Sequence, residues 1–196
     1  VPRQKIIEHE SYLNGLLDYI FHDMRRFRLQ HDSPHIAGMI VCETNPQARA
    51  LFRLLNARAA SEAAESGQPA FRAQLNLHDE GDKDERKLLV KAFKKQMTTD
   101  FLIVNEMLLT GFDAPRLKRL YLGRSLDGHN LLQALTRVNR PYGNHRYGYV
   151  VDFVDIKENL TIVVLNVNLK IFSNYVVLQD ILPLIIVSLM LVKLLN

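Results

Sequence analysis

The sequence has no tryptophan and one cysteine, Cys42, among its 196 residues. A single cysteine excludes an internal disulfide and a cluster of thiolate metal ligands, and it fits a reducing, cytoplasmic setting. Cys42 ends the apolar stretch "GMIVC", which predicts a buried strand residue, with a reactive thiol as the alternative. The sequence has neither a G-x-x-x-x-G-K-[ST] phosphate loop nor an H-E-x-x-H zinc motif, and its seven histidines show no ligand spacing.

Long apolar runs are absent before residue 161 and concentrated after it. Residues 161–196 contain three charged side chains, Lys170, Asp180 and Lys193. The run "ILPLIIVSLMLVKLL" contains Pro183 and Lys193 and is about 15 residues long, whereas a membrane-spanning helix needs about 20 apolar residues. We therefore expect no membrane partner, and we treat 161–196 as an apolar tail without an assigned role.

Neither sign of charge dominates, since 25 Lys and Arg stand against 21 Asp and Glu, for a net charge of +4. This balance is compatible with nucleic acid, although most such surfaces are simply solvated. Apolar residues make up 47% of the chain, enough for one core with some chain left over. The chain begins with Val1 and not Met, so we expect a fragment or a processed product.

Apolar residues recur at three- and four-residue steps between Ile7 and Leu29, which predicts one long amphipathic helix before the break at Ser33–His35. Short apolar runs then alternate with helical patterns over 45–66, 86–97 and 129–138. The expected strands are Gly38–Cys42, Arg72–Leu77, Asp100–Asn105, Arg119–Gly123 and Tyr147–Val154. This alternation predicts a three-layer α/β domain with a mainly parallel sheet, whose ligands bind at the carboxyl ends of the strands.

The stretch "LLQALTRVNRP" places Gln133, Arg137 and Arg140 in one row at helical spacing. Guanidinium groups bind phosphate oxygens through paired hydrogen bonds, so the row suits a phosphate group. A solvated basic helix face is the alternative, and spacing alone favours it.

The stretch "TGFDAP" indicates a loop shaped around a ligand or a partner strand. Gly111 permits close backbone approach, and Asp113 could accept a ribose hydroxyl or orient a metal-bound water. An ordinary turn, in which the aspartate caps backbone amides, is equally open. We expect this loop at the carboxyl edge of the sheet, within reach of the arginine-bearing helix.

The stretch "CETNPQ" precedes an expected helix, with Asn45 as its N-cap and Pro46 at its first position. Thr44, Asn45 and the first helical amides would form an anion site, because the helix dipole and unpaired N–H groups point towards them. A plain N-cap is the commoner explanation.

Three stretches, in this order, resemble the second RecA-like domain of superfamily 2 helicases and translocases, and more closely the motor (R) subunit of type I restriction enzymes. They are Met107–Pro115, Leu120–Pro141 and Tyr147–Leu160. The resemblance implies a helical linker at 1–35, a RecA-like domain with motifs IV to VI at 36–160, and the tail at 161–196. "DERK" (Asp84–Lys87) resembles an acidic helicase box, but it follows a polar loop and is discounted.

The resemblance also implies roles for residues. Motif VI would supply Arg140 as an arginine finger on the γ-phosphate of ATP, with Arg137 as a second phosphate contact. Motif V would face the same nucleotide. The residues expected at the nucleotide are Gly111, Asp113, Gln133, Arg137 and Arg140.

Nucleic acid would lie elsewhere on the same domain. Thr44 and Asn45, at the motif IV position, would touch its backbone, and Thr110 would link the nucleotide and DNA sites. Such contacts to phosphate are independent of base sequence.

ATP and Mg²⁺ would be held mainly by a first RecA-like domain outside this chain, so we expect this fragment alone to be inactive. It would act as part of an ATP-hydrolysing restriction endonuclease and DNA translocase. Its partners would be double-stranded DNA, the first RecA-like domain in cis, and the specificity and methyltransferase subunits. The alternatives are the second motor domain of another superfamily 2 DNA or RNA helicase, and a non-catalytic nucleic-acid-binding module.

Overall fold

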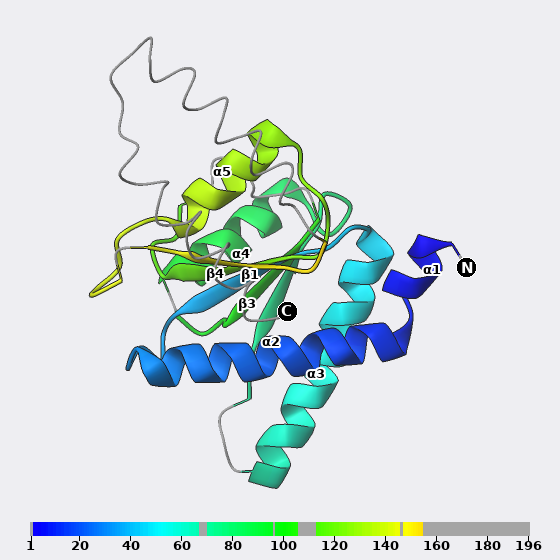
Figure 1. The fold of residues 1–196 in the computed structure, drawn as a ribbon, viewed down its shortest axis with the longest axis horizontal. Coiled ribbons are helices and arrows are strands. Elements are labelled where there is room, and N and C mark those ends of the chain that lie inside the picture. The colour runs from blue at the N-terminus through cyan, green and yellow to red at the C-terminus, as the bar shows by residue number, and fades with distance from the viewer. Residues whose placement is uncertain (1, 67–69, 96, 106–112, 146, 155–196) are drawn as a thin grey trace, which may run out of the picture.

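The structure is a computed structural model that describes residues 2–66, 70–95, 97–105, 113–145 and 147–154. Helices and strands alternate along most of this span (Figure 1). The elements are α1 (Arg3–Ile7), α2 (Glu10–Gln30), β1 (Ala37–Val41), α3 (Asn45–Ser66), β2 (Ala73–Asn76), α4 (Lys83–Lys95), β3 (Phe101–Val104), β4 (Leu117–Leu122), α5 (Gly128–Val138) and β5 (Tyr149–Asp152).

The five strands form one sheet in the order β2-β3-β1-β4-β5, and every pairing between them is parallel. Each strand is a short apolar run, and parallel strands buried on both faces have that composition. The predicted strands and the predicted α/β class are therefore confirmed. The single helix predicted over 7–29 is divided, because His9 caps α2 by accepting the Ser11 N–H at Nδ1, 3.2 Å away.

Helices cover both faces of the sheet, which makes the three layers. Helices α2 and α3 lie on one face, whereas α4 and α5 lie on the other (Figure 1). The side chains of β4 alternate accordingly, since Leu120 and Leu122 join the cluster with α4 and α5 while Tyr121 joins the cluster with α2 and α3.

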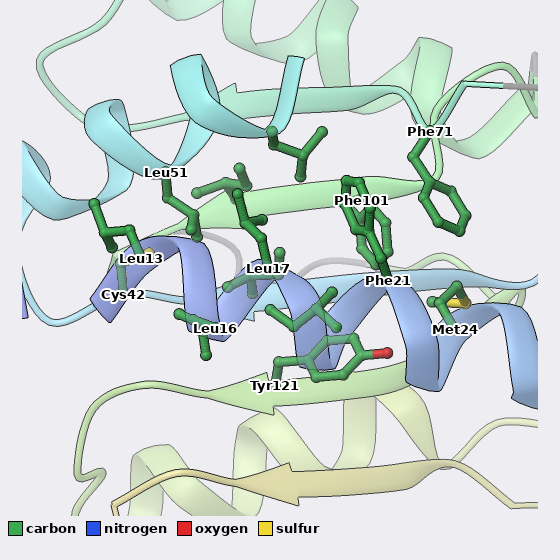
Figure 2. Packing of buried hydrophobic residues seen from close by; sticks show 14 of the residues in the cluster. Leu13, Leu16, Leu17, Phe21, Met24, Cys42, Leu51, Phe71, Phe101 and Tyr121 are labelled. Atoms are coloured by element: carbon green, nitrogen blue, oxygen red, sulfur yellow. The ribbon is translucent and has the colours of Figure 1, made fainter. Parts of the chain in front are cut away.

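Helix α2 packs directly on the sheet, with Leu17, Phe21 and Met24 pointing at the strands (Figure 2). It passes close to β1 at Gly38, where an added Cβ would lie 3.0 Å from Met24 Cε and 3.0 Å from Tyr121 Cε2. Glycine therefore allows the helix to approach the strand. Helix α2 therefore belongs to one of the two helical layers of this fold. The assignment of residues 1–35 as a linker stays a prediction.

A buried ion pair ties α2 to β4. The Arg119 guanidinium donates to both carboxylate oxygens of Asp23, through Nε at 2.9 Å and through Nη2, and the Tyr121 hydroxyl donates to Asp23 Oδ2 at 2.8 Å. The guanidinium also lies 4.5 Å from the centre of the Phe27 ring. Charges buried this deeply are tolerated because each is paired and hydrogen-bonded.

Cys42 is buried, as predicted, and desolvation raises the pKa of its thiol to about 12. Within the described residues, no helix is both long and apolar enough to cross a membrane. The tail at 161–196 and the motif V residues Thr110 and Gly111 lie outside the described residues.

Candidate functional site

Asp113 and Arg140 meet at the amino end of β4. The Arg140 Nη1 group donates to Asp113 Oδ1. Next to Asp113, the Ala114 carbonyl accepts the N–H of Leu117, the first residue of β4, at 2.9 Å. The Arg140 carbonyl accepts a hydrogen bond from Lys118 Nζ on the same strand.

The prediction that these two residues lie at the carboxyl edge of the sheet is therefore wrong. All the strands are parallel, so each connection must return the chain to the amino edge before the next strand can begin. Asp113 stands just before β4, and Arg140 stands after the helix that returns the chain towards β5. Both residues therefore lie at the amino edge of the sheet.

Arg140 is also not on the helix that carries Gln133 and Arg137. Helix α5 ends at Val138, and its C-cap Asn139 has ψ 56°, outside the helical range. Pro141 is a further barrier to a longer helix, since a proline disfavours helical conformation in the residue before it, here Arg140. Gln133 and Arg137 remain one turn apart on α5, and the Gln133 amide nitrogen lies 2.6 Å from His129 Nε2.

The Asp113–Arg140 pair is accessible to a ligand. The Arg140 side chain is 35% exposed and the Asp113 side chain 57% exposed. Exposed ion pairs contribute about 0–1 kcal/mol, so either partner can be exchanged for another ion at small cost. Asp113 therefore holds the guanidinium in place without preventing it from binding a phosphate oxygen.

Beneath this pair, the amino edge is built from buried cations. Arg116, 2% exposed, donates to the carbonyls of Phe93 at 3.0 Å, His35 at 3.0 Å and Thr99 at 2.5 Å. Lys118 is fully buried on the same strand. These charges are satisfied by backbone oxygens, which belong to segments far apart in the sequence.

Thr44 and Asn45 lie at the other edge of the sheet, where α3 begins after β1. The N-cap is Thr44 and not Asn45, because the Thr44 hydroxyl oxygen accepts the Gln47 N–H at 3.1 Å and the Thr44 carbonyl accepts the Ala48 N–H at 3.0 Å. Asn45 is then the first helical residue and Pro46 the second. The prediction placed the cap one residue too late.

A chain of side-chain hydrogen bonds crosses the carboxyl edge from β4 to the loop after β2. Arg124 Nη1 donates to Asn105 Oδ1 at 2.7 Å, and Asn105 Nδ2 donates to Asn45 Oδ1 at 3.0 Å. Asn45 Nδ2 in turn donates to Asp79 Oδ2 at 3.0 Å, and Asp79 pairs with Arg49 at 2.7 Å. The hydrogen bond from Arg49, with that from Asn45, lowers the pKa of Asp79.

Acidic side chains also occupy the start of α3. The Thr44 hydroxyl donates to Glu8 Oε1 at 2.7 Å, and Arg3 pairs with Glu43 at 2.7 Å. The Thr44 hydroxyl thus binds a carboxylate of the same chain, and the anion site at Thr44 and Asn45 stays a prediction.

Comparison with known proteins places this arrangement in a family. The family model for domain 3 of the type I restriction enzyme R subunit matches residues 28–155. The chain belongs to this family. The match includes both edges described above, and it begins within α2.

Named relatives agree with that assignment. The HindI type I restriction endonuclease subunit of Haemophilus influenzae is 40% identical, over 40% of this chain and 8% of its own length. A protein of Methanocaldococcus jannaschii, provisionally named the type I restriction enzyme MjaVIIP endonuclease subunit, is 41% identical over 43% of this chain and 10% of its own length. The chain thus spans about a tenth of the length of these relatives.

Solved structures confirm the RecA-like fold of this R-subunit domain. A fragment provisionally assigned as the HsdR subunit of a type I restriction enzyme from Vibrio vulnificus YJ016 aligns with a TM-score of 0.57 and 20% identity, covering 78% of this chain and 28% of that one. The C-terminal part of the Fun30 ATPase domain aligns with a TM-score of 0.55 and 13% identity, covering 89% of this chain and 51% of that one. Both likenesses concern the fold alone.

No three His, Cys, Asp or Glu side chains gather into a metal site within the described parts of the R-subunit domain. The discounted "DERK" stretch forms the first turn of α4, where Lys87 pairs with Asp84 at 2.8 Å. Acidic residues in a first helical turn complement the helix dipole, so they need no metal to explain them.

Several residues of the two edges were not among the predicted site residues, including Arg116, Lys118, Asn105 and Arg124. A weak signal was present for the first two, because "RLKRLYL" places cations inside an apolar strand. For the other two, the signal was a polar residue one or two positions after each of two buried strands, which is where ligands of parallel sheets bind.

Proposed function

We propose that this domain is the second RecA-like half of the ATP-dependent DNA translocase motor of a type I restriction enzyme, with Arg140 as its arginine finger. The observation that carries the proposal is the accessible Arg140 guanidinium, held by Asp113 on one edge of a RecA-like fold. The family match favours a restriction motor over other superfamily 2 helicases.

Arg140 would exchange Asp113 for oxygens of the γ-phosphate when a first RecA-like domain brings ATP to the amino edge. A guanidinium placed there stabilises the charge of the phosphoryl-transfer transition state, an effect of about 10³ to 10⁵ in rate. After the phosphate leaves, Arg140 would form its ion pair with Asp113 again. In this proposal Gly111, Gln133 and Arg137 support the nucleotide contacts, and Mg²⁺ is held mainly by the first domain.

Hydrolysis of ATP releases phosphate, and the two domains would then part and move along DNA. Thr44 and Asn45 at the carboxyl edge, with Thr110, would contact the DNA backbone. Arg124 extends this set, because its guanidinium is the cation at the β4 end of the chain of hydrogen bonds that includes Asn45. The duplex, the specificity subunit and the methyltransferase subunit are the proposed partners of the whole enzyme.

The deciding experiment measures DNA-stimulated ATP hydrolysis by the full-length R subunit in its assembled complex. We expect Arg140→Ala to lower kcat by at least about a thousandfold while duplex binding is retained. Arg26→Ala is the matched control, since it removes one exposed guanidinium from α2, and it should leave kcat unchanged.

Wild-type turnover that survived Arg140→Ala would remove Arg140 from the role of finger. A complete R subunit that bound DNA but showed no hydrolysis would favour the alternative of a non-catalytic nucleic-acid-binding module.

A further inference from the structure

The backbone on both sides of Arg140 makes close contacts with neighbouring loops. Before it, the carbonyl of Val138, the last residue of α5, lies so close to Gly148 that an added Cβ there would be 2.2 Å from the oxygen. After it, Tyr142 and His145 form a two-stranded hairpin through paired backbone hydrogen bonds of 2.9 Å. The His145 ring then lies 2.9 Å, at Nε2, from the Ser33 hydroxyl.

Between these two contacts, the main-chain carbonyl of Arg140 is bound by the buried amine of Lys118. Its Nζ donates to the Arg140 carbonyl, beneath the C-terminal end of α5. The alternation of β4 explains this direction, because Lys118 shares its face with Leu120 and Leu122, which pack against α5. An ammonium group near a helix C-terminus is also favoured by the helix dipole.

We propose that Lys118 is a positioning residue, which fixes the main chain of Arg140 so that its guanidinium points along the amino edge of the sheet. This inference rests on the proposed role of Arg140 as the finger. Lys118 acts through the carbonyl of Arg140 and does not touch the nucleotide. A lysine with a purely structural role would satisfy the same carbonyl, so the two roles are separated by kcat, by its pH profile and by the double variant with Arg140→Ala.

Desolvation lowers the pKa of Lys118 to about 8. The Arg140 carbonyl accepts a hydrogen bond from its amine, and the titratable group that interacts with it is His145, whose ring faces that of His31. The pKa of His145 is itself lowered from 6.5 by burial, then by His31 and Lys118, so a transition near pH 8 belongs to Lys118.

Activity and stability should therefore move in opposite directions with pH. A protonated amine forms the stronger, charge-assisted hydrogen bond to the Arg140 carbonyl, so kcat should fall as pH rises through about 8. The unfolded chain binds more protons than the folded chain between pH 8 and 10.5, so the contribution of Lys118 to stability rises over the same interval.

The test compares Lys118→Met with wild type in the full-length complex. We expect kcat for DNA-stimulated ATP hydrolysis to fall about a hundredfold, the scale of a 1 Å misplacement of a catalytic group. The melting temperature should be unchanged or higher, and Lys118→Arg should recover part of kcat without the pH limb near 8. Lys91→Met, at an exposed position on α4, is the matched control.

Two further measurements separate the possible failures. In an Arg140→Ala background, Lys118→Met should have no additional effect on kcat.

If Arg140→Ala is inactive but Lys118→Met retains full kcat, the positioning role of Lys118 is wrong, whereas the role of Arg140 as the finger is retained. If Arg140→Ala retains activity, the proposed function fails first. If Lys118→Met does not fold, the wild-type pH profile decides, and a kcat that stays level through pH 8 overturns the inference.

Discussion

At the amino edge of the sheet, buried cations bind backbone carbonyls, whereas at the carboxyl edge partly exposed side chains bind one another. Arg116 and Lys118 exemplify the first arrangement, and the chain from Arg124 through Asn105 to Asn45 exemplifies the second. Carbonyl positions are set by the fold, so the buried cations of the amino edge cannot change partners without moving whole elements. Side-chain amides can rotate and change partners.

This difference suits the two proposed tasks. An arginine finger has to stand in one position, and catalysis falls steeply when that position changes. A surface that moves along DNA has to release one phosphate and take another, which exchangeable donors permit. The following predictions test whether one edge is in fact fixed and the other adaptable.

The largest expected effect concerns Cys42, whose thiol lies just beneath the adaptable carboxyl edge. Burial raises its pKa from 9.0 to about 12, so the thiolate fraction at pH 8 should be about a thousandfold below that of an ordinary cysteine. Native protein should therefore react with a thiol reagent at least that much more slowly than protein unfolded in urea. Because Cys42 is the sole cysteine, the measured rate belongs to it alone.

The matched control is Arg26→Cys, which adds an exposed thiol on α2 that should react rapidly in the native state. Fast labelling of Cys42 in the wild type would mean that the carboxyl edge opens far enough to expose the buried residues beneath it, and that its rearrangement is not confined to surface side chains.

The next effect compares one arginine from each edge. Arg116→Met removes the donor of three hydrogen bonds to backbone carbonyls and should lower the free energy of unfolding by at least about 3 kcal/mol. Arg49→Met removes ion pairs with Asp79 and Glu80 on a side chain that is 37% exposed, and should lower the free energy of unfolding far less than Arg116→Met does. Urea unfolding of both variants measures the difference, and equal losses would contradict the contrast between the edges.

A smaller effect is expected on DNA binding by the full-length subunit. Arg124→Ala should weaken duplex binding about tenfold, close to the loss of one charge-assisted hydrogen bond. The slope of log affinity against log salt should fall by about one, because one phosphate contact is lost. ATP hydrolysis at saturating DNA should stay near the wild-type rate, and Arg26→Ala should change neither quantity. An unchanged slope would remove Arg124 from the DNA surface.

Local pattern was enough to predict the strands and the helices, because each strand is a short apolar run and each helix has its own periodicity. The local pattern could not predict at which edge of the sheet Asp113 and Arg140 lie, because that depends on the direction of all the strands. The hydrogen bonds of the Arg116 guanidinium could not be predicted from the local sequence either, because the accepting residues lie 23, 81 and 17 positions away. Arg140 was assigned to a helix because its spacing matched, although Pro141 stood beside it.

The smallest effect concerns the start of α3, where the sequence placed the cap on Asn45 and the structure places it on Thr44. Thr44→Ala should lower the free energy of unfolding by about 1 kcal/mol, because the Gln47 N–H loses its acceptor. Thr44→Ser keeps the hydroxyl and should stay near wild type. Asn45→Ala breaks only the exchangeable amide contacts of the carboxyl edge and should cost less than Thr44→Ala. If urea unfolding instead showed that Asn45→Ala destabilises the protein more than Thr44→Ala, the side-chain hydrogen bonds of Asn45 would contribute to the stability of the fold. The two edges would then differ less than their contacts indicate.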